Sequence, residues 1–268
     1  MQNNFYLKKK MKPVCLILGA GSGIGGNTAR VFAKNGYHVH LCRRSDSKGL
    51  DALIKSINIE NENMASGEIL NLIEDHIFED LINRVELNYG PIEVCILNLG
   101  AQIGTKMLAE TTEKQFTLGW KMTQLTLFKL SKVLLPKMTE RKKGTLIVTS
   151  STASVRGNEG QLSHSAAMGG RRLLCQSLHA EFSPQGIHIA HVIIDGIVDS
   201  PDTVGKMLGE KKFDELKKIK TTNGIINPEK IAETYLHLVH QHPSAWTFEM
   251  DLRSQNELAW WNSESRNV

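Results

Sequence analysis

Short, almost continuously apolar runs alternate along the chain with longer segments of helical periodicity. Apolar runs of this kind are typical of parallel strands covered on both faces, and their alternation with helices predicts an α/β fold. The expected strands are 14–18, 38–42, 68–71, 94–97, 145–149, 188–194 and 247–250. The expected helices are 24–35, 49–57, 75–88, 113–135, 163–182 and 229–241. We therefore expect a doubly wound parallel sheet in three layers.

No internal repeat, low-complexity linker or domain boundary interrupts this pattern. A single domain is expected over residues 13–252, between an N-terminal tail at 1–12 and a C-terminal tail at 253–268. The segment from about 200 to 226 breaks the rhythm, because it is polar, rich in lysine and of helical character. We call residues 200–226 the lid, since we expect them to fold over the mouth of a pocket.

Composition narrows the class of protein further. The 268 residues carry a net charge of only +4, and this excess is dispersed, so nucleic acid is not an indicated partner. No run approaches the roughly 18 apolar residues that span a bilayer, and the N-terminus lacks the apolar stretch of a secretory signal. The four cysteines form no CxxC pair, which favours a reducing, cytoplasmic setting. The basic run at 8–12 is either a solvated tail or a segment for targeting or for an anionic surface.

A glycine-rich stretch, Gly19-Ala20-Gly21-Ser22-Gly23-Ile24-Gly25, follows the first expected strand and opens the first expected helix. In that context the glycines permit a tight turn and a close approach of the backbone to a pyrophosphate, and the helix N-terminus provides amide donors. The candidate nucleotide-binding residues here are Gly19, Gly21, Ser22, Gly23, Ile24 and Gly25. The alternative is an ordinary glycine-rich turn.

The end of the second expected strand predicts which nucleotide is bound. It reads Leu41-Cys42-Arg43-Arg44, with no acidic residue before Asp46. An acid at this place holds the ribose hydroxyls of NAD, whereas arginine pairs with the additional phosphate of NADP. The sequence therefore favours NADP(H) over NAD(H), with Arg43 as the main phosphate ligand and Arg44 in support. The alternative is two surface arginines in a loop.

With these motifs the chain resembles the classical short-chain dehydrogenases/reductases over about residues 12–252. The family's TGxxxGxG loop is matched apart from its threonine, and its NNAG motif appears as Leu97-Asn98-Leu99-Gly100. Its PG motif appears as Asp195-Gly196. The resemblance implies a Rossmann-type fold with further cofactor-binding residues at Asn71, Asn98, Gly100, Gly196, Val198 and Ser200.

The catalytic positions of the family carry over one at a time. Its serine is present as Ser151, thirteen residues before the position of its tyrosine, which is His164. Its lysine, four residues further, is Met168, and its helix-borne asparagine aligns with Thr123. The resemblance therefore implies Ser151, His164 and Thr123 as catalytic residues, with three of four positions changed.

These changes are chemically coherent as a set. In the family, the lysine lowers the pKa of a tyrosine from about 10 so that it exchanges a proton near neutral pH. Methionine has no charge and no donor, so Met168 cannot take that role. An imidazole titrates near pH 6.5 without help, so His164 replaces the tyrosine without needing the lysine.

Three functions remain open at this point. The leading one is an oxidoreductase acting on the carbonyl or alcohol of an unidentified small molecule. The second is an NADP-binding protein without turnover, acting as a sensor or interaction partner, in which the changed NNAG motif and Asp195 are further signs of decay. The third is a scaffold that binds no cofactor. No metal site is expected, because His237 and His240 lack a carboxylate or cysteine to complete a ligand set.

Assembly is suggested by resemblance alone. The expected helices 113–135 and 163–182 are similar to those that family members use to pair subunits, which implies a homodimer or homotetramer. Trp260 and Trp261 lie beyond the last expected strand, where they cover the apolar surface of their own chain or fill a neighbouring subunit.

Overall fold

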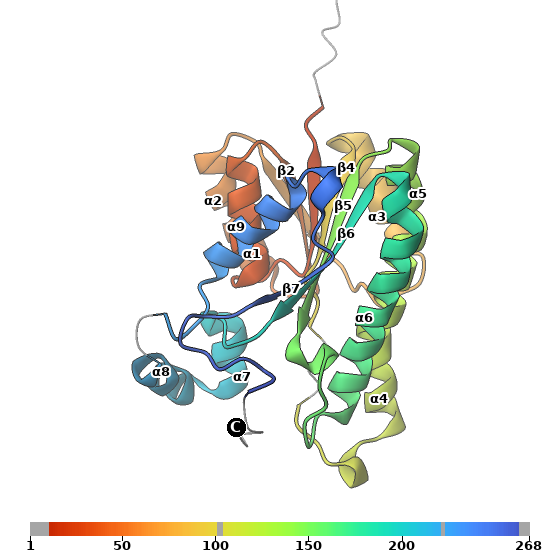
Figure 1. Ribbon diagram of the computed structural model, residues 1–268. Coiled ribbons are helices and arrows are strands. Elements are labelled where there is room, and N and C mark those ends of the chain that lie inside the picture. Colours follow the sequence, from red (N-terminus) through yellow and green to blue (C-terminus); the bar gives the residue numbers. More distant parts are fainter. Residues whose placement is uncertain (1–10, 101–103, 221–222, 263–268) are drawn as a thin grey trace, which may run out of the picture.

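The computed structural model describes residues 11–100, 104–220 and 223–262, and its centre is a seven-stranded sheet. All neighbouring strands are parallel, in the order β3-β2-β1-β4-β5-β6-β7 (Figure 1). The strands are β1 (Val14–Leu18), β2 (His38–Arg43), β3 (Ala65–Ile69), β4 (Ile92–Leu97), β5 (Gly144–Ser151), β6 (Ile187–Ile194) and β7 (Glu249–Leu252). The predicted fold, a doubly wound sheet in a single domain, is confirmed.

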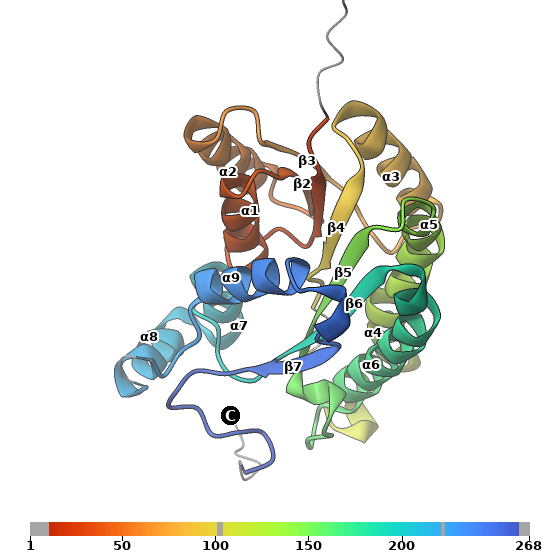
Figure 2. The same ribbon diagram turned by 45° about the horizontal axis from the view of Figure 1, so that its top comes forward.

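Helices cover both faces of this sheet. One face packs against α1 (Ile24–Lys34), α2 (Ser47–Glu60) and α9 (Pro228–Val239), and the other against α3 (Ile77–Asn88), α5 (Thr126–Glu140) and α6 (Leu162–Phe182) (Figure 2). Within β1, Cys15 and Ile17 join the first core, whereas Val14, Leu16 and Leu18 join the second. Because successive side chains of a strand point to opposite faces, burial on both faces requires the continuous apolar run that the sequence shows.

Two edge strands are displaced from their expected positions. The third strand, expected at 68–71, is Ala65–Ile69, and the last, expected at 247–250, is Glu249–Leu252. Small residues begin β3, and Gly67 pairs with Leu41 of β2 where a Cβ atom would come 2.5 Å from the carbonyl oxygen of Leu41. Backbone pairing therefore decides this strand, rather than the side-chain propensity that the sequence pattern follows.

The long helix expected at 113–135 is divided. It consists of α4 (Glu113–Trp120), a π-helical turn η2 (Lys121–Leu125) and α5, which continues to Glu140. The hydroxyl of Thr123 lies inside this turn and donates to the carbonyl of Gly119 at 2.8 Å. Such π turns insert one residue into the helical repeat, which hydrophobic periodicity does not reveal.

The lid contains the helical structure that the sequence predicts. It includes a π-helical turn η5 (Pro201–Gly205), the short α7 (Lys206–Leu208) and α8 (Glu210–Ile219), which lie beyond the carboxyl ends of the strands (Figure 2). A bridge between Val198 and Ile226 ties the beginning of this excursion to its end. Among the residues described, no helix is long and apolar enough to cross a membrane.

Candidate functional site

The glycine loop packs closely against the strand beside it. Gly19 has a φ of +96°, and a Cβ atom there would come 2.5 Å from the carbonyl oxygen of Asn98, at the end of β4. A Cβ atom at Gly25 would overlap the carbonyl oxygen of Gly19. Two of the predicted glycines are therefore required by sterics, as the motif implies.

The N-terminus of α1 follows directly on the glycine loop, and the amide of Gly26 donates back to the carbonyl of Gly21 at 2.7 Å. Gly23 is the N-cap residue, no side chain caps it, and the first turn contains no acidic residue. The backbone amides and the positive end of the helix dipole therefore suit an anion such as a pyrophosphate. Ser22 is exposed at the tip of the loop, and Ile24 begins the helix.

Asn98 connects the end of β4 to this loop. Its side-chain amide donates to the carbonyl oxygen of Gly19 at 3.0 Å, and its backbone amide donates to Leu18 at 2.8 Å. The neighbouring Leu99 lines a pocket, while Gly100 is exposed at the last position described before residue 104. The asparagine that remains of the NNAG motif thus holds the glycine loop in place.

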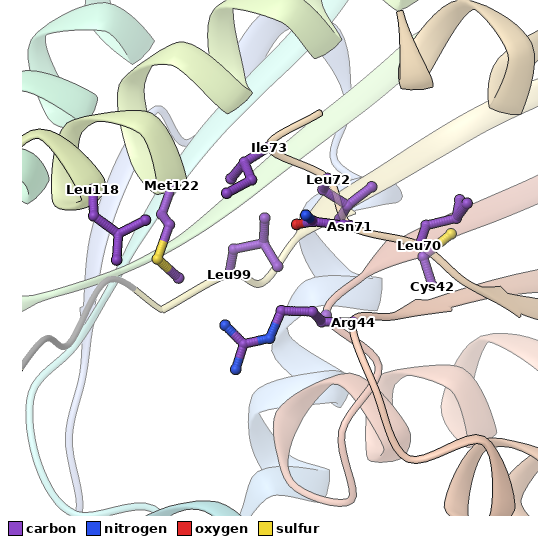
Figure 3. A pocket seen from close by; sticks show the side chains of 10 residues that line it. Cys42, Arg44, Leu70, Asn71, Leu72, Ile73, Leu99, Leu118 and Met122 are labelled. Carbon is purple, nitrogen blue, oxygen red and sulfur yellow. The ribbon is translucent and has the colours of Figure 1, made fainter. Parts of the chain in front are cut away.

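A pocket opens beside the glycine loop (Figure 3). Its walls are mostly apolar, and the guanidinium of Arg44 and the amide of Asn71 are the polar groups within it (Figure 3). The side-chain amide of Asn71 donates to Glu74 at 3.0 Å. The lining residues are Gly19, Cys42, Arg44, Leu70, Asn71, Leu72, Ile73, Leu99, Leu118 and Met122.

The two arginines after β2 have different surroundings. Arg43 forms an ion pair with Asp46 at 3.1 Å, and its side chain is only 15% exposed. Arg44 lines the pocket instead. Arg43, the main phosphate ligand expected from the sequence, thus has an anionic partner, whereas Arg44 faces the pocket. The difference follows from Asp46, which begins α2 three residues after Arg43.

The lid rests directly on the glycine loop. Ser200 is only 2% exposed, and its hydroxyl is hydrogen-bonded to Thr203. A Cβ atom at Gly23 would come 2.5 Å from the hydroxyl oxygen of Ser200. A hydrogen bond to Ser22 lowers the pKa of Asp202, and the positive charge of Lys206 lowers it further. Gly196, with a φ of +151°, begins the excursion that brings these residues here.

The two central catalytic candidates lie side by side. Ser151 is the last residue of β5, and His164 lies in the first turn of α6. The hydroxyl oxygen of Ser151 is 3.3 Å from Nε2 of His164, within hydrogen-bonding distance. The spacing of thirteen residues therefore places an alcohol and an imidazole together at the carboxyl edge of the sheet.

Met168, one turn further along α6, is 3% exposed and packs against Ala153 and Ala167. Its sulfur lies 3.5 Å from Nη2 of Arg171, which donates to it. The lysine position therefore carries a packed apolar side chain instead of a solvated group.

Arg171 itself was not singled out by the sequence analysis. It is fully buried, and both of its terminal nitrogens donate to the carbonyl oxygen of Leu99, at 3.0 and 2.6 Å. Burial lowers its pKa to about 10. No carboxylate pairs with it in the described part of the chain. Its spacing from Met168, three positions along one helix, is the signal that could have placed it on the same buried face.

Thr123 is buried between two helices. Its hydroxyl donates to the carbonyl of Gly119 at 2.8 Å, and the carbonyl oxygen of Ala167 lies 3.2 Å from the same oxygen, so the two carbonyls share one proton. This geometry connects the π-helical turn to the segment of α6 that carries Met168. The hydroxyl of Thr123, for which the resemblance implies a catalytic role, is thus engaged by backbone groups.

Asp195, which the sequence analysis took as a sign of decay, has a definite structural role. It is 5% exposed, and its Oδ2 accepts from Nε of Arg253 at 2.9 Å and from the backbone amide of Trp260 at 3.0 Å. This carboxylate therefore anchors residues beyond the last strand to the end of β6. Within the described ranges, no three His, Cys, Asp or Glu side chains lie close enough to hold a metal ion.

Comparison with known proteins agrees with this geometry. A family model described as short chain dehydrogenase matches residues 13–210. A 3-oxoacyl-acyl-carrier-protein reductase of Thermotoga maritima is 25% identical over 86% of this chain and 92% of its own. A short-chain dehydrogenase from Rhodopseudomonas palustris has a TM-score of 0.74 and 29% identity, covering 90% of this chain and 98% of that one.

A second solved structure shares this fold. It is the NADPH-bound form of a short-chain oxidoreductase from Pseudomonas aeruginosa, described as containing an atypical catalytic center. Its TM-score is 0.78 at 19% identity, over 90% of this chain and 95% of that one, which shows a shared fold. Together with the match to the family model over 13–210, these findings show that the chain belongs to the short-chain dehydrogenase family.

Proposed function

We propose that this protein is an NADP(H)-dependent oxidoreductase that acts on a carbonyl or alcohol of a small molecule. The observation that carries the proposal is the pairing of Ser151 and His164, with 3.3 Å between the hydroxyl oxygen and Nε2. Hydride transfer is the chemistry that NADP(H) supplies when bound. The protein then has to hold the substrate oxygen and exchange one proton with it.

Ser151 and His164 divide these two tasks. The hydroxyl of Ser151 donates to the substrate oxygen and fixes its position. His164 delivers a proton from Nε2 to that oxygen in the direction of reduction and removes it in the direction of oxidation. An imidazole performs this exchange near neutral pH without a neighbouring cation, which is consistent with methionine at position 168.

The preference for NADP(H) rests on the pocket beside the glycine loop. Its apolar walls suit a purine ring, and Arg44 directs a guanidinium into it (Figure 3). A guanidinium pairs with a phosphate through two parallel hydrogen bonds. The related Pseudomonas aeruginosa protein binds NADPH, as its description states.

Two measurements on purified protein test the proposal. We expect NADPH to raise the unfolding temperature more than NADH does, because a ligand at about 100 times its dissociation constant adds about 2.7 kcal/mol of stability. In a carbonyl-substrate screen, His164→Phe should lower kcat by about 10²- to 10⁴-fold while leaving the NADPH-induced shift in place. A His164→Phe enzyme with an unchanged rate would remove the proton-transfer role.

One observation favours a second function, an NADP-binding protein without turnover. Met168 and Arg171 are packed together in the interior, so no donor from the lysine position reaches the ribose side of the site. A protein of this kind would bind NADPH, reduce no carbonyl in the screen, and change its assembly when the nucleotide binds. Binding without turnover would therefore identify it.

We also propose a homo-oligomer of two or four subunits in a reducing, cytoplasmic setting. Exposed apolar side chains lie on α4, α5 and α6, among them Phe116, Trp120, Phe128 and Leu173. Apolar groups gathered on neighbouring helices suit a subunit interface. The cysteines are all free and buried, which is consistent with thiols that are kept reduced.

A further inference from the structure

The row of residues at the carboxyl edge of the sheet determines what lies beside the catalytic pair. The register aligns Ser151 of β5 with Ile194 of β6, and Ile194 with Leu252 of β7. Neighbouring strands are about 4.8 Å apart, so Leu252 lies about 10 Å from Ser151. The chain beyond Leu252 therefore starts on the side of the catalytic pair that faces away from the glycine loop.

Residues 253–262 then return across the ends of the strands instead of leaving the domain. Figures 1 and 2 show this segment, in dark blue, looping back from β7 toward the green connection between β5 and α6. On the way, Glu257 forms an ion pair with Lys220, and the backbone amide of Asn256 donates to Asn223 at 3.3 Å, both at the end of the lid.

Trp260 is fixed at the centre of this return. Its backbone amide donates to Oδ2 of Asp195 at 3.0 Å, and its indole nitrogen donates to Asp251 at 3.2 Å. Its carbonyl oxygen accepts from the guanidinium of Arg156 at 2.7 Å. Arg253 completes the cluster by donating to both aspartates, at 2.9 and 2.8 Å.

These contacts involve two segments next to the catalytic pair, one after β6 and one between Ser151 and His164. Asp195 follows β6, the strand next to β5, which carries Ser151. Arg156 lies in the connection between Ser151 and His164. The backbone of Trp260 is therefore joined both to the end of β6 and to the connection that separates Ser151 from His164. A partly buried tryptophan held by three hydrogen bonds has little freedom to move away from an entering ligand.

We propose that residues 253–262 form the substrate-side wall of the cleft and that Trp260 limits the size of the group a ketone substrate carries beside its carbonyl. Asp195 is the positioning residue for this wall. That this wall faces a substrate rests on the proposed oxidoreductase function. Its geometric part, the shielding of His164 by Trp260, can be tested without turnover.

The first test measures access to His164 with diethyl pyrocarbonate, which modifies imidazole nitrogens, followed by peptide mass spectrometry. Trp260→Ala should raise the modification rate of His164 several-fold while the exposed His237 on α9 reacts at its original rate. Leu87→Ala is the control, since Leu87 on α3 is 81% exposed, lies outside residues 253–262 and should leave the modification rate of His164 unchanged. Cysteines that stay unreactive to Ellman's reagent establish that the variant is folded.

The second test compares a small and a bulky ketone, ethyl acetoacetate and ethyl benzoylacetate, with NADPH. Trp260→Ala should raise the ratio of kcat/KM for the bulky over the small ketone by about tenfold or more, and Trp260→Phe should keep the ratio near that of the unchanged protein. Equal modification rates of His164 in Trp260→Ala and the unchanged protein would overturn the wall. Absence of turnover in every protein counts against the oxidoreductase function, while the modification rates still decide the wall.

Discussion

The two arginines after β2 offer a test of cofactor choice that separates structure from sequence. Arg44 lines the pocket, while Arg43 is paired with Asp46 at 3.1 Å. A hydrogen bond to a charged partner contributes about 1.5–3 kcal/mol, so Arg44→Ala should weaken NADPH binding by about 10- to 150-fold. NADH lacks the additional phosphate, and its dissociation constant should stay within about twofold of the original value.

Arg43→Ala is the matched control, because it removes the same charge from the neighbouring position. Arg43 would have to leave Asp46 to reach a phosphate, so its loss should weaken NADPH binding by less than about tenfold. Fluorescence titrations of both variants and the unchanged protein with NADPH and NADH, at one ionic strength, give the dissociation constants. Each variant is then compared with the unchanged protein for each nucleotide. A larger effect from Arg43→Ala than from Arg44→Ala would refute the reasoning from the pocket and restore the assignment made from sequence.

Two further changes should affect stability. Gly25→Ala places a Cβ atom against the backbone of Gly19 and 2.8 Å from Cα of Ala20. Urea unfolding should therefore show a free energy of unfolding lower by about 1–3 kcal/mol, and a thermal-shift assay should show no response to NADPH. An intact response to NADPH would contradict this steric role. Burial lowers the pKa of both His38 and His191 to about 4, below the ordinary value of 6.5. The unfolded chain therefore binds more protons between pH 6.5 and 4, so stability is full above pH 6.5 and falls toward pH 4, by about 2 kcal/mol per histidine at pH 5. Urea unfolding between pH 4 and 7 measures this dependence of stability on pH. If His38→Gln kept the same pH dependence as the unchanged protein, the role of His38 would be refuted.

The fold around the glycine loop was largely readable from sequence, because its signals are local. The turn at Gly19, the start of α1 at Ile24 and the apolar run of β1 lie within eleven residues, and each has a steric or periodic cause. Asn98 was also identified, since its place after β4 fixes it beside the loop. The ion pair between Arg43 and Asp46 was not predicted, because it depends on how two side chains pair in the folded chain.

The surroundings of Ser151 and His164 were only partly readable, because many of the contacts there join distant segments. Ser151 and His164 were predicted together, and the helix that follows β5 does bring them together. The bonds from Asp195 to Arg253 and Trp260 cross 58 and 65 positions, so the aspartate looked like decay when only its neighbours were considered. Arg171 was overlooked because an arginine on a helix is normally exposed, and only packing against Leu99 shows that it is buried.

The strand order has a consequence for how such a protein changes over generations. The chain places β1, β2 and β3 in one direction from the centre and β4, β5, β6 and β7 in the other, so the direction of winding reverses once, between β1 and β4. Positions 164 and 168 both lie on α6, far along the second branch, whereas Gly25 and Arg44 belong to the first. Inherited substitutions on α6 can therefore accumulate while the glycine loop and the end of β2 keep their residues. A lineage with this topology can try new reactions, or abandon reaction altogether, without first giving up its nucleotide.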